Sequence, residues 1–508
     1  MNDMNAVDIV RVCSPRPHAP FFVIGPYANK VSFVAQQIRA LNLVYSLWIT
    51  KKINRDDQVA IIGGGIAGLT AAVALVGYGV KVDLYESGAT LLSRQIETIH
   101  RIVNPSITRW PHEILSATTS LRFLDWFEMP CSDVAKLLVS EFEEVQKKNP
   151  RRLKDLVGVK VTMITQGSDA HLSLELDGAA NEERYAAVLV TLGFGTEDSG
   201  VGLLHPNEWV GYWTPDSIVD TRNNYPKTRF IISGAGDGGM IDLLRIVHRK
   251  FEMGVLPVTV ARLLEGTDVA NKIKIVENES LRDIGWEKLL DDAYMELVKV
   301  IDDKSRPEYQ PLRDLLDASY MTGSPVHYLV DNQRKFPVSK AASPINKLLV
   351  YHAKHRNRVD FLHGAVQVTE THVILPNKAR HLRATTRVIV RHGPSATFDN
   401  CITQDDLDFL KMHQMQVADE LAIPIWKNGL KPPKPLPPMD PASPLYRDYR
   451  LDIARKYLNS VTKEYVSLKT TSDGYEAEGA FKDGVPTEAF GVKISTRPPI
   501  VASPILTI

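Results

Sequence analysis

The sequence has few cysteines, no excess charge of either sign and no long apolar run that suggests a membrane span. Its 508 residues include 3 cysteines, and 60 basic side chains balance 60 acidic ones. A balanced charge disfavours a nucleic-acid partner, which needs a basic surface. Cys13, Cys131 and Cys401 lie far apart and form no Cys-x-x-Cys motif, so the chain lacks a redox-active cysteine pair.

Several catalytic and metal-binding motifs are also missing. There is no Gly-x-Ser-x-Gly elbow, P-loop or His-Glu-x-x-His motif, which leaves hydrolytic and phosphoryl-transfer chemistry without support. His352 and His355 fall three apart on a predicted helix, but no carboxylate or cysteine completes a ligand spacing, so we expect no metal. The first residues lack the basic-then-apolar order of a signal peptide, so we predict a cytoplasmic protein with no membrane partner.

The most informative segment that is present runs from Val59 to Glu86. An apolar strand leads into Gly63, Gly65 and Gly68 in Gly-x-Gly-x-x-Gly spacing, and a helix and a second strand follow. This pattern predicts a βαβ unit that binds a dinucleotide pyrophosphate at the helix N-terminus. Glu86 ends the second strand, where its carboxylate accepts from a ribose diol and repels a 2′-phosphate, which favours FAD or NAD over NADP. The predicted binding residues are Gly63, Gly65, Ile66, Ala67, Gly68 and Glu86.

A longer pattern extends this motif. Leu69, Ala72, Leu75, Gly79, Val80 and Val82 stand in register with Glu86, and this resembles the N-terminal FAD-binding motif of glutathione-reductase and amine-oxidase type flavoproteins. The resemblance implies a two-dinucleotide-binding oxidoreductase with FAD on the first unit, here without the cysteine pair. In such proteins the chain after the ribose carboxylate passes the cofactor, which makes Arg94 a candidate pocket residue, although a solvated surface loop is an equal alternative.

Two further features fit the resemblance. The strands predicted within residues 158–178 look like a β-meander, and the strand after them ends at Thr191, Leu192 and Gly193. This end resembles the Ala-Thr-Gly turn at which such chains leave the FAD domain, and it adds Gly193 to the candidate cofactor contacts. Leu192 departs from the pattern, which has a smaller residue there.

A second glycine motif follows the apolar run from Arg229 to Ser233. Gly234, Gly236 and Gly239 repeat the Gly-x-Gly-x-x-Gly spacing ahead of an amphipathic helix, which predicts a second Rossmann-like unit for NAD(P)H. We expect the next strand within VLPVTVARLLE. Glu265 is a candidate for binding a ribose diol and Arg262 for binding a 2′-phosphate, so the choice between NAD and NADP stays open. Asp237, inside the loop, either repels a pyrophosphate or caps the helix. The polar run from Asp331 to Lys335 is interpreted as a solvated loop, with a strand-end site as the alternative.

The chain is expected to return to the FAD domain near Val390. Flavoproteins of the resembled type usually present a Gly-Asp pair at this return, which holds the ribityl chain and pyrophosphate, but none follows Val390. We therefore predict that Arg391 and His392 face the FAD and partly replace that pair.

Together these features predict an α/β protein in which a Rossmann-like FAD-binding domain carries an inserted second Rossmann-like NAD(P)-binding domain. The predicted function is an FAD-dependent oxidoreductase that passes hydride from NAD(P)H to flavin and electrons to a small-molecule substrate or dioxygen. The alternative is a non-catalytic dinucleotide sensor that retains the fold. The C-terminal extension is interpreted as an appended lobe or the arm of a homodimer. The predicted parts are a helical segment (1–56), the FAD domain (57–200 and 341–422), the inserted domain (201–340) and a proline-rich linker with the extension (423–508).

Overall fold

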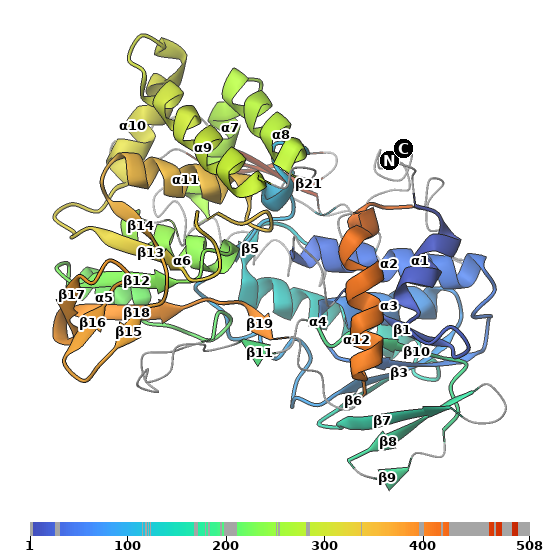
Figure 1. Cartoon of the computed structure of the whole chain (residues 1–508). Coiled ribbons are helices and arrows are strands. Elements are labelled where there is room, and N and C mark those ends of the chain that lie inside the picture. The colour runs from blue at the N-terminus through green and yellow to red at the C-terminus, as the bar shows by residue number, and fades with distance from the viewer. Residues whose placement is uncertain are drawn as a thin grey trace.

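The computed structural model describes most of the chain up to residue 425 and three strands beyond it (Figure 1). The described residues are 4–25, 31–113, 115–116, 119, 121, 123–166, 171–177, 179–180, 183–193, 196–197, 211–249, 251, 254–280, 285–336, 338–395, 401–417, 420–425, 467–471, 474–479 and 490–495. Most of the predicted extension, 423–508, therefore lies outside them. No helix in the described part of the chain is both long and apolar enough for a transmembrane segment.

The first unit is a five-stranded parallel sheet in the order β1-β10-β2-β3-β6. Its strands are short apolar runs whose alternate side chains point to opposite faces, and both faces are covered, as parallel sheets require. The strands are β1 (Phe21–Val23), β2 (Gln58–Ile62), β3 (Lys81–Glu86), β6 (Leu153–Val157) and β10 (Ala187–Val190).

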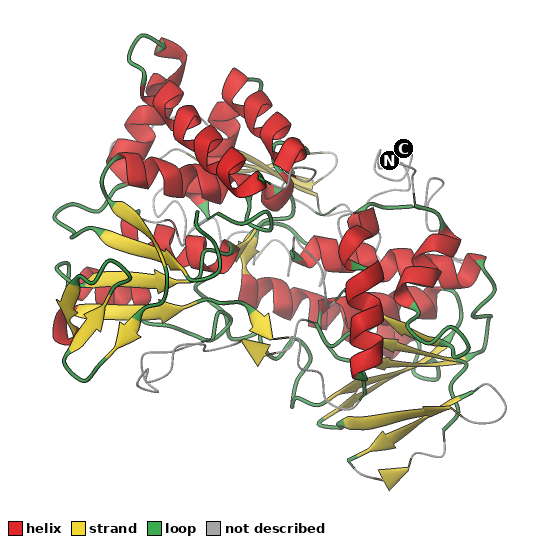
Figure 2. Ribbon diagram, viewed as in Figure 1, coloured by secondary structure: helices red, strands yellow, loops and turns green. Residues whose placement is uncertain are grey.

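Helices cover one face of this sheet and a small antiparallel sheet covers the other (Figures 1 and 2). Val59 and Ile61 of β2 pack among the helices, whereas Ala60 and Ile62 face the antiparallel strands. The helices are α1 (Ala6–Cys13), α2 (Phe33–Ile49), α3 (Ile66–Gly77) and α4 (Cys131–Lys148), and the antiparallel strands are β7 (Val161–Gln166), β8 (Leu172–Leu176) and β9 (Ala179–Ala180). The β-meander that the sequence predicts is therefore present.

The second unit repeats this plan. Its parallel sheet has the order β14-β13-β12-β18, with helices on one face and a three-stranded antiparallel sheet on the other. The parallel strands are β12 (Arg229–Ser233), β13 (His327–Asp331), β14 (Val359–His363) and β18 (Thr386–Val390). The covering elements are α5 (Ile218–Asn224), α6 (Asp237–Val247), α11 (Pro344–His355), β15 (Gln367–Val368), β16 (His372–Ile374) and β17 (Arg380–Leu382).

A helical insertion separates α6 from the next strand of its sheet, β13. It contains α7 (Val255–Leu264), α8 (Asp268–Ser280), α9 (Trp286–Asp302) and α10 (Gln310–Ser319). The strand predicted within VLPVTVARLLE is wrong, because this segment is α7. Its buried Leu256, Val260, Ala261 and Leu264 follow helical spacing, which outweighs the β-branched composition.

The predicted return to the first sheet near Val390 is also wrong. β18 pairs in parallel with β12 of the second sheet, and the edge beside β10 is instead taken by β1, from the N-terminal segment. The chain does return after residue 400, but as α12 (Gln404–His413), whose Leu407 and Leu410 pack against the first sheet. The N-terminal segment, predicted to be helical only, therefore supplies a strand as well.

Short elements connect the two units. β11 (Thr196–Glu197) leaves the first unit and pairs antiparallel with β19 (Pro394–Ser395), which leaves the second. The remaining elements are β4 (Ile102–Val103), β5 (Met129–Pro130), β20 (Ser467–Thr471), β21 (Gly474–Gly479), β22 (Phe490–Ser495) and single 3-10 turns at Ile107–Arg109, Pro307–Tyr309, Arg383–Thr385, Met415–Val417 and Glu420–Ala422.

Candidate dinucleotide sites

The first glycine motif forms the tight turn between β2 and α3. Gly63 has a φ of +112°, and a Cβ on it would lie 2.8 Å from the carbonyl oxygen of Thr191. A Cβ on Gly68 would lie 2.0 Å from the carbonyl oxygen of Gly63, so the helix approaches the turn too closely for any side chain. Both positions therefore require glycine for the fold itself.

Gly65 differs, because a Cβ there would meet nothing within 4 Å. Packing does not demand glycine at this position, and the open space is what a bound pyrophosphate needs. Gly65 is also the N-cap of α3 and has no side chain to cap the first backbone N–H groups. Ile66 and Ala67 form the first turn of α3, so their N–H groups lie where an anion is favoured.

Glu86 ends β3 beside this turn. Its Oε2 accepts from the backbone N–H of Gly64 at 2.7 Å, and its Oε1 accepts from that of Gly88 at 2.6 Å. These two bonds fix the half-buried carboxylate next to the glycine turn, and each oxygen keeps a lone pair for a ribose hydroxyl. We call the glycine turn with its open space at Gly65, together with the uncapped start of α3 and the fixed Glu86, the first cradle. These features fit a dinucleotide such as FAD.

Thr191 ties the neighbouring strand β10 to the turn. Its buried hydroxyl lies 3.0 Å from the carbonyl oxygen of Ile62 and 2.8 Å from that of Gly63, to which it donates. Gly193, two residues later, has a φ of +76° and open space around it. Arg94 lies in the loop after Glu86 with an exposed side chain. Contact of Gly193 or Arg94 with a cofactor remains a prediction.

The second glycine motif reproduces this geometry residue by residue. Gly234 has a φ of +116°, and its Cβ would lie 2.1 Å from the carbonyl oxygen of Arg391. A Cβ on Gly239 would lie 1.9 Å from the carbonyl oxygen of Gly234, whereas one on Gly236 would meet nothing within 4 Å. Gly236 is the N-cap of α6, again without a side-chain cap. The chain therefore contains two equivalent cradles.

The acid of the second unit is Asp331, at the end of β13. The N–H of Gly234 donates to Val330, and that of Ala235 donates to Oδ2 of Asp331 at 3.3 Å, as Gly63 and Gly64 do toward Tyr85 and Glu86. Asp331 is buried, so the solvated-loop interpretation is wrong for this residue. Its Oδ2 also pairs with Nη1 of Arg334 at 3.0 Å.

Glu265, one of the two alternatives that the sequence left open, does not end a strand. Glu265 is an exposed residue at the C-terminal end of α7. The helical insertion lengthens the segment between α6 and β13, so the usual interval between glycine motif and acid does not apply. The sequence signal that could have identified Asp331 is the apolar run VHYLV directly before it, which is typical of a buried strand that ends at an acid.

Asp237 neither caps α6 nor projects unsupported from the loop. Its Oδ1 accepts from the backbone N–H of Ser343 and from the Nδ2 group of Asn346, both at 2.9 Å. These donors lie at the start of α11, so the carboxylate joins the two helix N-termini and its charge is partly offset there.

Arg391 and His392 lie beside the second glycine turn. Because β18 belongs to the second sheet, the premise that placed them at the FAD is wrong. The Arg391 guanidinium is buried, and its Nε donates to Oδ2 of Asp242 at 2.8 Å. His392 Nε2 hydrogen-bonds the hydroxyl of Ser233 at 2.7 Å.

A buried ion network continues from Arg391. Asp242 and Arg245 on α6, Asp216 before α5 and Arg101 from the first unit pair with one another. Burial by itself raises the pKa of Asp242, but Arg101, Arg391 and Arg245 outweigh it and hold that pKa well below the usual range. The carboxylate therefore stays charged, and the network has a packing role at the junction of the units.

The three cysteines are free and buried, and none is placed for redox chemistry. Burial raises the pKa of Cys13 to about 12, which keeps the thiol protonated and unreactive. His352 hydrogen-bonds the hydroxyl of Tyr320 through Nδ1. Among the described residues no group of three His, Cys, Asp or Glu side chains is arranged to hold a metal.

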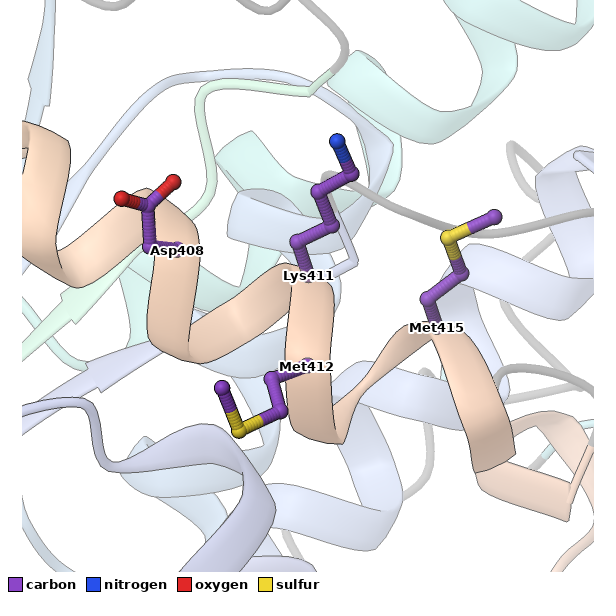
Figure 3. Close-up of a pocket in the computed structure, with 4 residues that line it drawn as sticks. All are labelled: Asp408, Lys411, Met412 and Met415. Carbon is purple, nitrogen blue, oxygen red and sulfur yellow. The ribbon is translucent and has the colours of Figure 1, made fainter.

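A separate open pocket of about 540 Å³ lies along α12 and the 3-10 turn that follows it. It is lined by Asp408, Lys411, Met412 and Met415 (Figure 3). The side chains do not converge on a common point, and none belongs to either glycine cradle, so this pocket is not the candidate site.

Comparison with known proteins gives one family match. Residues 57–241 match the pyridine nucleotide-disulphide oxidoreductases. The matched region contains both glycine turns, which confirms over that region the resemblance inferred from the sequence. None of the curated proteins matches the chain.

The similarity to solved structures is distant. Bacillithiol disulfide reductase from Staphylococcus aureus is 13% identical, with a TM-score of 0.36 over 67% of this chain and 77% of that one. Thioredoxin reductase from T. acidophilum is 14% identical, with a TM-score of 0.33 over 73% and 98%. Cyclohexanone monooxygenase from Rhodococcus sp. is 13% identical, with a TM-score of 0.38 over 68% and 73%.

Proposed function

Starting from the match of residues 57–241 to the pyridine nucleotide-disulphide oxidoreductases, we propose that this chain is an FAD-dependent oxidoreductase reduced by NADH. The observation that carries the proposal is the pair of equivalent cradles. Each combines a glycine with open space, Gly65 or Gly236, with an acid fixed beside the turn, Glu86 or Asp331. A chain with two such sites binds two dinucleotides.

The first cradle is assigned to FAD. Bound FAD supplies the redox chemistry, because its ring accepts a hydride and passes electrons on. The chain's own residues hold it: the N–H groups at the start of α3 face the pyrophosphate, and Glu86 accepts from the adenosine ribose. No residue needs to act as acid or base on the cofactor.

The second cradle is assigned to a nicotinamide dinucleotide. The Asp331 carboxylate accepts from the backbone N–H groups of Ala235, Gln333 and Arg334 and from the Arg334 guanidinium, so a ribose diol would take the place of that guanidinium. The buried charge repels a 2′-phosphate, which supports NADH over NADPH. Arg334 lies beside this position, but its guanidinium is paired with Asp331. The carboxylate therefore offsets the charge of Arg334, which by itself would favour a 2′-phosphate.

The electron acceptor is proposed to be a small molecule or dioxygen. The family's name refers to disulphide chemistry, but all three cysteines of this chain are buried and free. Electrons therefore leave the flavin without passing through a cysteine pair of this chain. A cytoplasmic location and a homodimer stay part of the proposal, on the sequence features given above.

The deciding experiment is to purify the full-length protein, release the bound cofactor and identify it by mass. The holoprotein is then mixed anaerobically with NADH and, separately, with NADPH while flavin absorbance is followed. We expect FAD and faster bleaching with NADH. A colourless protein that binds a nicotinamide dinucleotide without turnover would instead support the sensor alternative and overturn the proposal.

A further inference from the structure

The first sheet has an edge strand that comes from the N-terminal segment. β1 runs parallel to β10, with Val23 opposite Val190, and the N–H of Ile24 continues the ladder to the carbonyl oxygen of Val190. Parallel strands end at the same side of a sheet, where ligands of α/β proteins gather. The residues after Val23 therefore lie on the side that carries the Gly63 turn.

The chain at this end of β1 packs tightly on α2. Gly25 has a φ of +64°, and a Cβ on it would lie 2.9 Å from Oε1 of Gln36 and 3.6 Å from Cδ of Arg39. Both side chains come from the first two turns of α2. Gly25 thus lets the backbone approach the helix, and the Gln36 amide lies beside the end of the strand.

Gln36 is unusual because its amide nitrogen is buried and has no hydrogen-bond acceptor among the described residues. The residue is 8% exposed, and its Nε2 group makes no hydrogen bond in the described part of the chain. A buried donor of this kind is uncommon in folded proteins and calls for a partner. The next residue, Gln37, is the contrast: its Nε2 donates to Leu124 and its Oε1 accepts from Trp126.

Aromatic rings link the start of α2 to the second glycine turn. The ring of Phe33 is 6.0 Å from that of Trp213, and Trp213 is 4.9 Å from Tyr212. Tyr212 in turn lies against Gly238 of the second glycine turn, where a Cβ would be 3.0 Å from its ring. The start of α2 therefore lies at the end of β1, through Gly25, and is connected through these rings to the second glycine turn.

We propose that Gln36 binds FAD, with its Nε2 group donating to an oxygen of the chain that links the adenosine to the flavin ring. The assignment rests on the proposed function and adds a binding residue to it. The N-terminal segment is then part of the cofactor site, and supplies the sheet edge and polar contact that the sequence led us to expect after Val390. The first unit is circularly permuted relative to that expected order.

The test uses full-length protein with Gln36→Leu, which keeps the side-chain volume and removes the amide. FAD is removed, the apoprotein is titrated with FAD, and flavin fluorescence gives the Kd, with the flavin-to-protein ratio from absorbance. We expect the Kd to rise at least tenfold, about 1.4 kcal/mol. The melting temperature of the apoprotein should not fall, because an unsatisfied buried donor is removed.

Gln37→Leu is the matched control on the same helix. It leaves Trp126 and Leu124 without their partners, so it should lower the melting temperature of the apoprotein while its folded fraction binds FAD within twofold of wild type. Gln36→Met provides the same comparison if leucine prevents folding. An unchanged Kd in a folded Gln36 variant overturns this assignment alone. Failure of the wild-type protein to bind FAD overturns the proposed function and this assignment with it.

Discussion

Arg101 of the first unit donates through Nη1 to Oδ1 of Asp242 on α6 of the second, at 2.5 Å. Both side chains are almost fully buried, and the Arg101 guanidinium also lies 3.8 Å above the ring of Tyr212. The pair therefore joins the two dinucleotide units through charges that water does not screen.

Replacing Asp242 with Asn should destabilise the protein strongly. Arg101, Arg245 and Arg391 would remain buried together without their shared carboxylate. Removing one partner of a buried ion pair costs about 3–5 kcal/mol, which urea unfolding would measure. Glu296→Gln, which removes an exposed pair with Lys299, is the control and should stay within about 0.5 kcal/mol. Equal effects of the two variants would contradict the buried role.

Stability should decline below neutral pH because two histidines are buried in the neutral form. Burial, and after it the neighbouring His352 for His248 and Arg229 for His327, lowers the pKa of both histidines to about 3. The unfolded chain, with histidine near pH 6.5, takes up these protons first, so stability is full above that pH and is lost as pH falls toward 3.

Urea unfolding at pH 7.5, 6 and 5 would measure this loss. Two protons taken up on unfolding correspond to about 2.7 kcal/mol per pH unit between pH 6 and 5. His327→Gln should reduce that slope by about half, provided the variant folds. A slope that is the same in wild type and variant would show that His327 is not responsible.

Valine substitutions at Gly65 and at Gly236 should show which cofactor each cradle binds. Neither Cβ meets a neighbour in the fold, so both variants should fold. Gly65→Val should give colourless protein, because the side chain fills the space of the FAD pyrophosphate. Gly236→Val should keep its flavin but slow reduction by NADH at least tenfold, about 1.4 kcal/mol in the barrier. Full flavin content in the Gly65 variant would refute the FAD assignment.

Asp331→Asn should weaken the preference for NADH. Loss of the carboxylate removes both the acceptor for the ribose diol and the repulsion of a 2′-phosphate, and it releases Arg334. The ratio of the rates of flavin reduction by NADH and NADPH should fall at least tenfold, about 1.4 kcal/mol. Glu265→Gln, on the surface at the end of α7, should leave the ratio unchanged. A larger change in the Glu265 variant would favour Glu265 as the acid that binds the ribose diol.

Features formed by residues close together in the sequence could be predicted, whereas features that join distant segments could not. Both glycine turns could be predicted from short motifs. The tight turn, the close contact between the first and third glycines and the start of the helix all involve residues that are adjacent in the sequence. Asp331 was not assigned, because the helices from Val255 to Ser319 separate it from its glycine turn. β1 was missed because a strand of three residues gives almost no periodic signal, and its partner β10 follows more than 160 residues later.

The N-terminal position of β1 also sets the order in which the protein is assembled. All five strands of the first sheet lie between Phe21 and Val190, ahead of the second glycine turn. At about 5–20 residues per second, a ribosome makes these strands several seconds before β12 and its partners emerge. The sheet can therefore close, and a cofactor can enter, while the nicotinamide unit is still being synthesised. Residues that pack on it from later in the chain, including those of α12 and Leu421, are added afterwards.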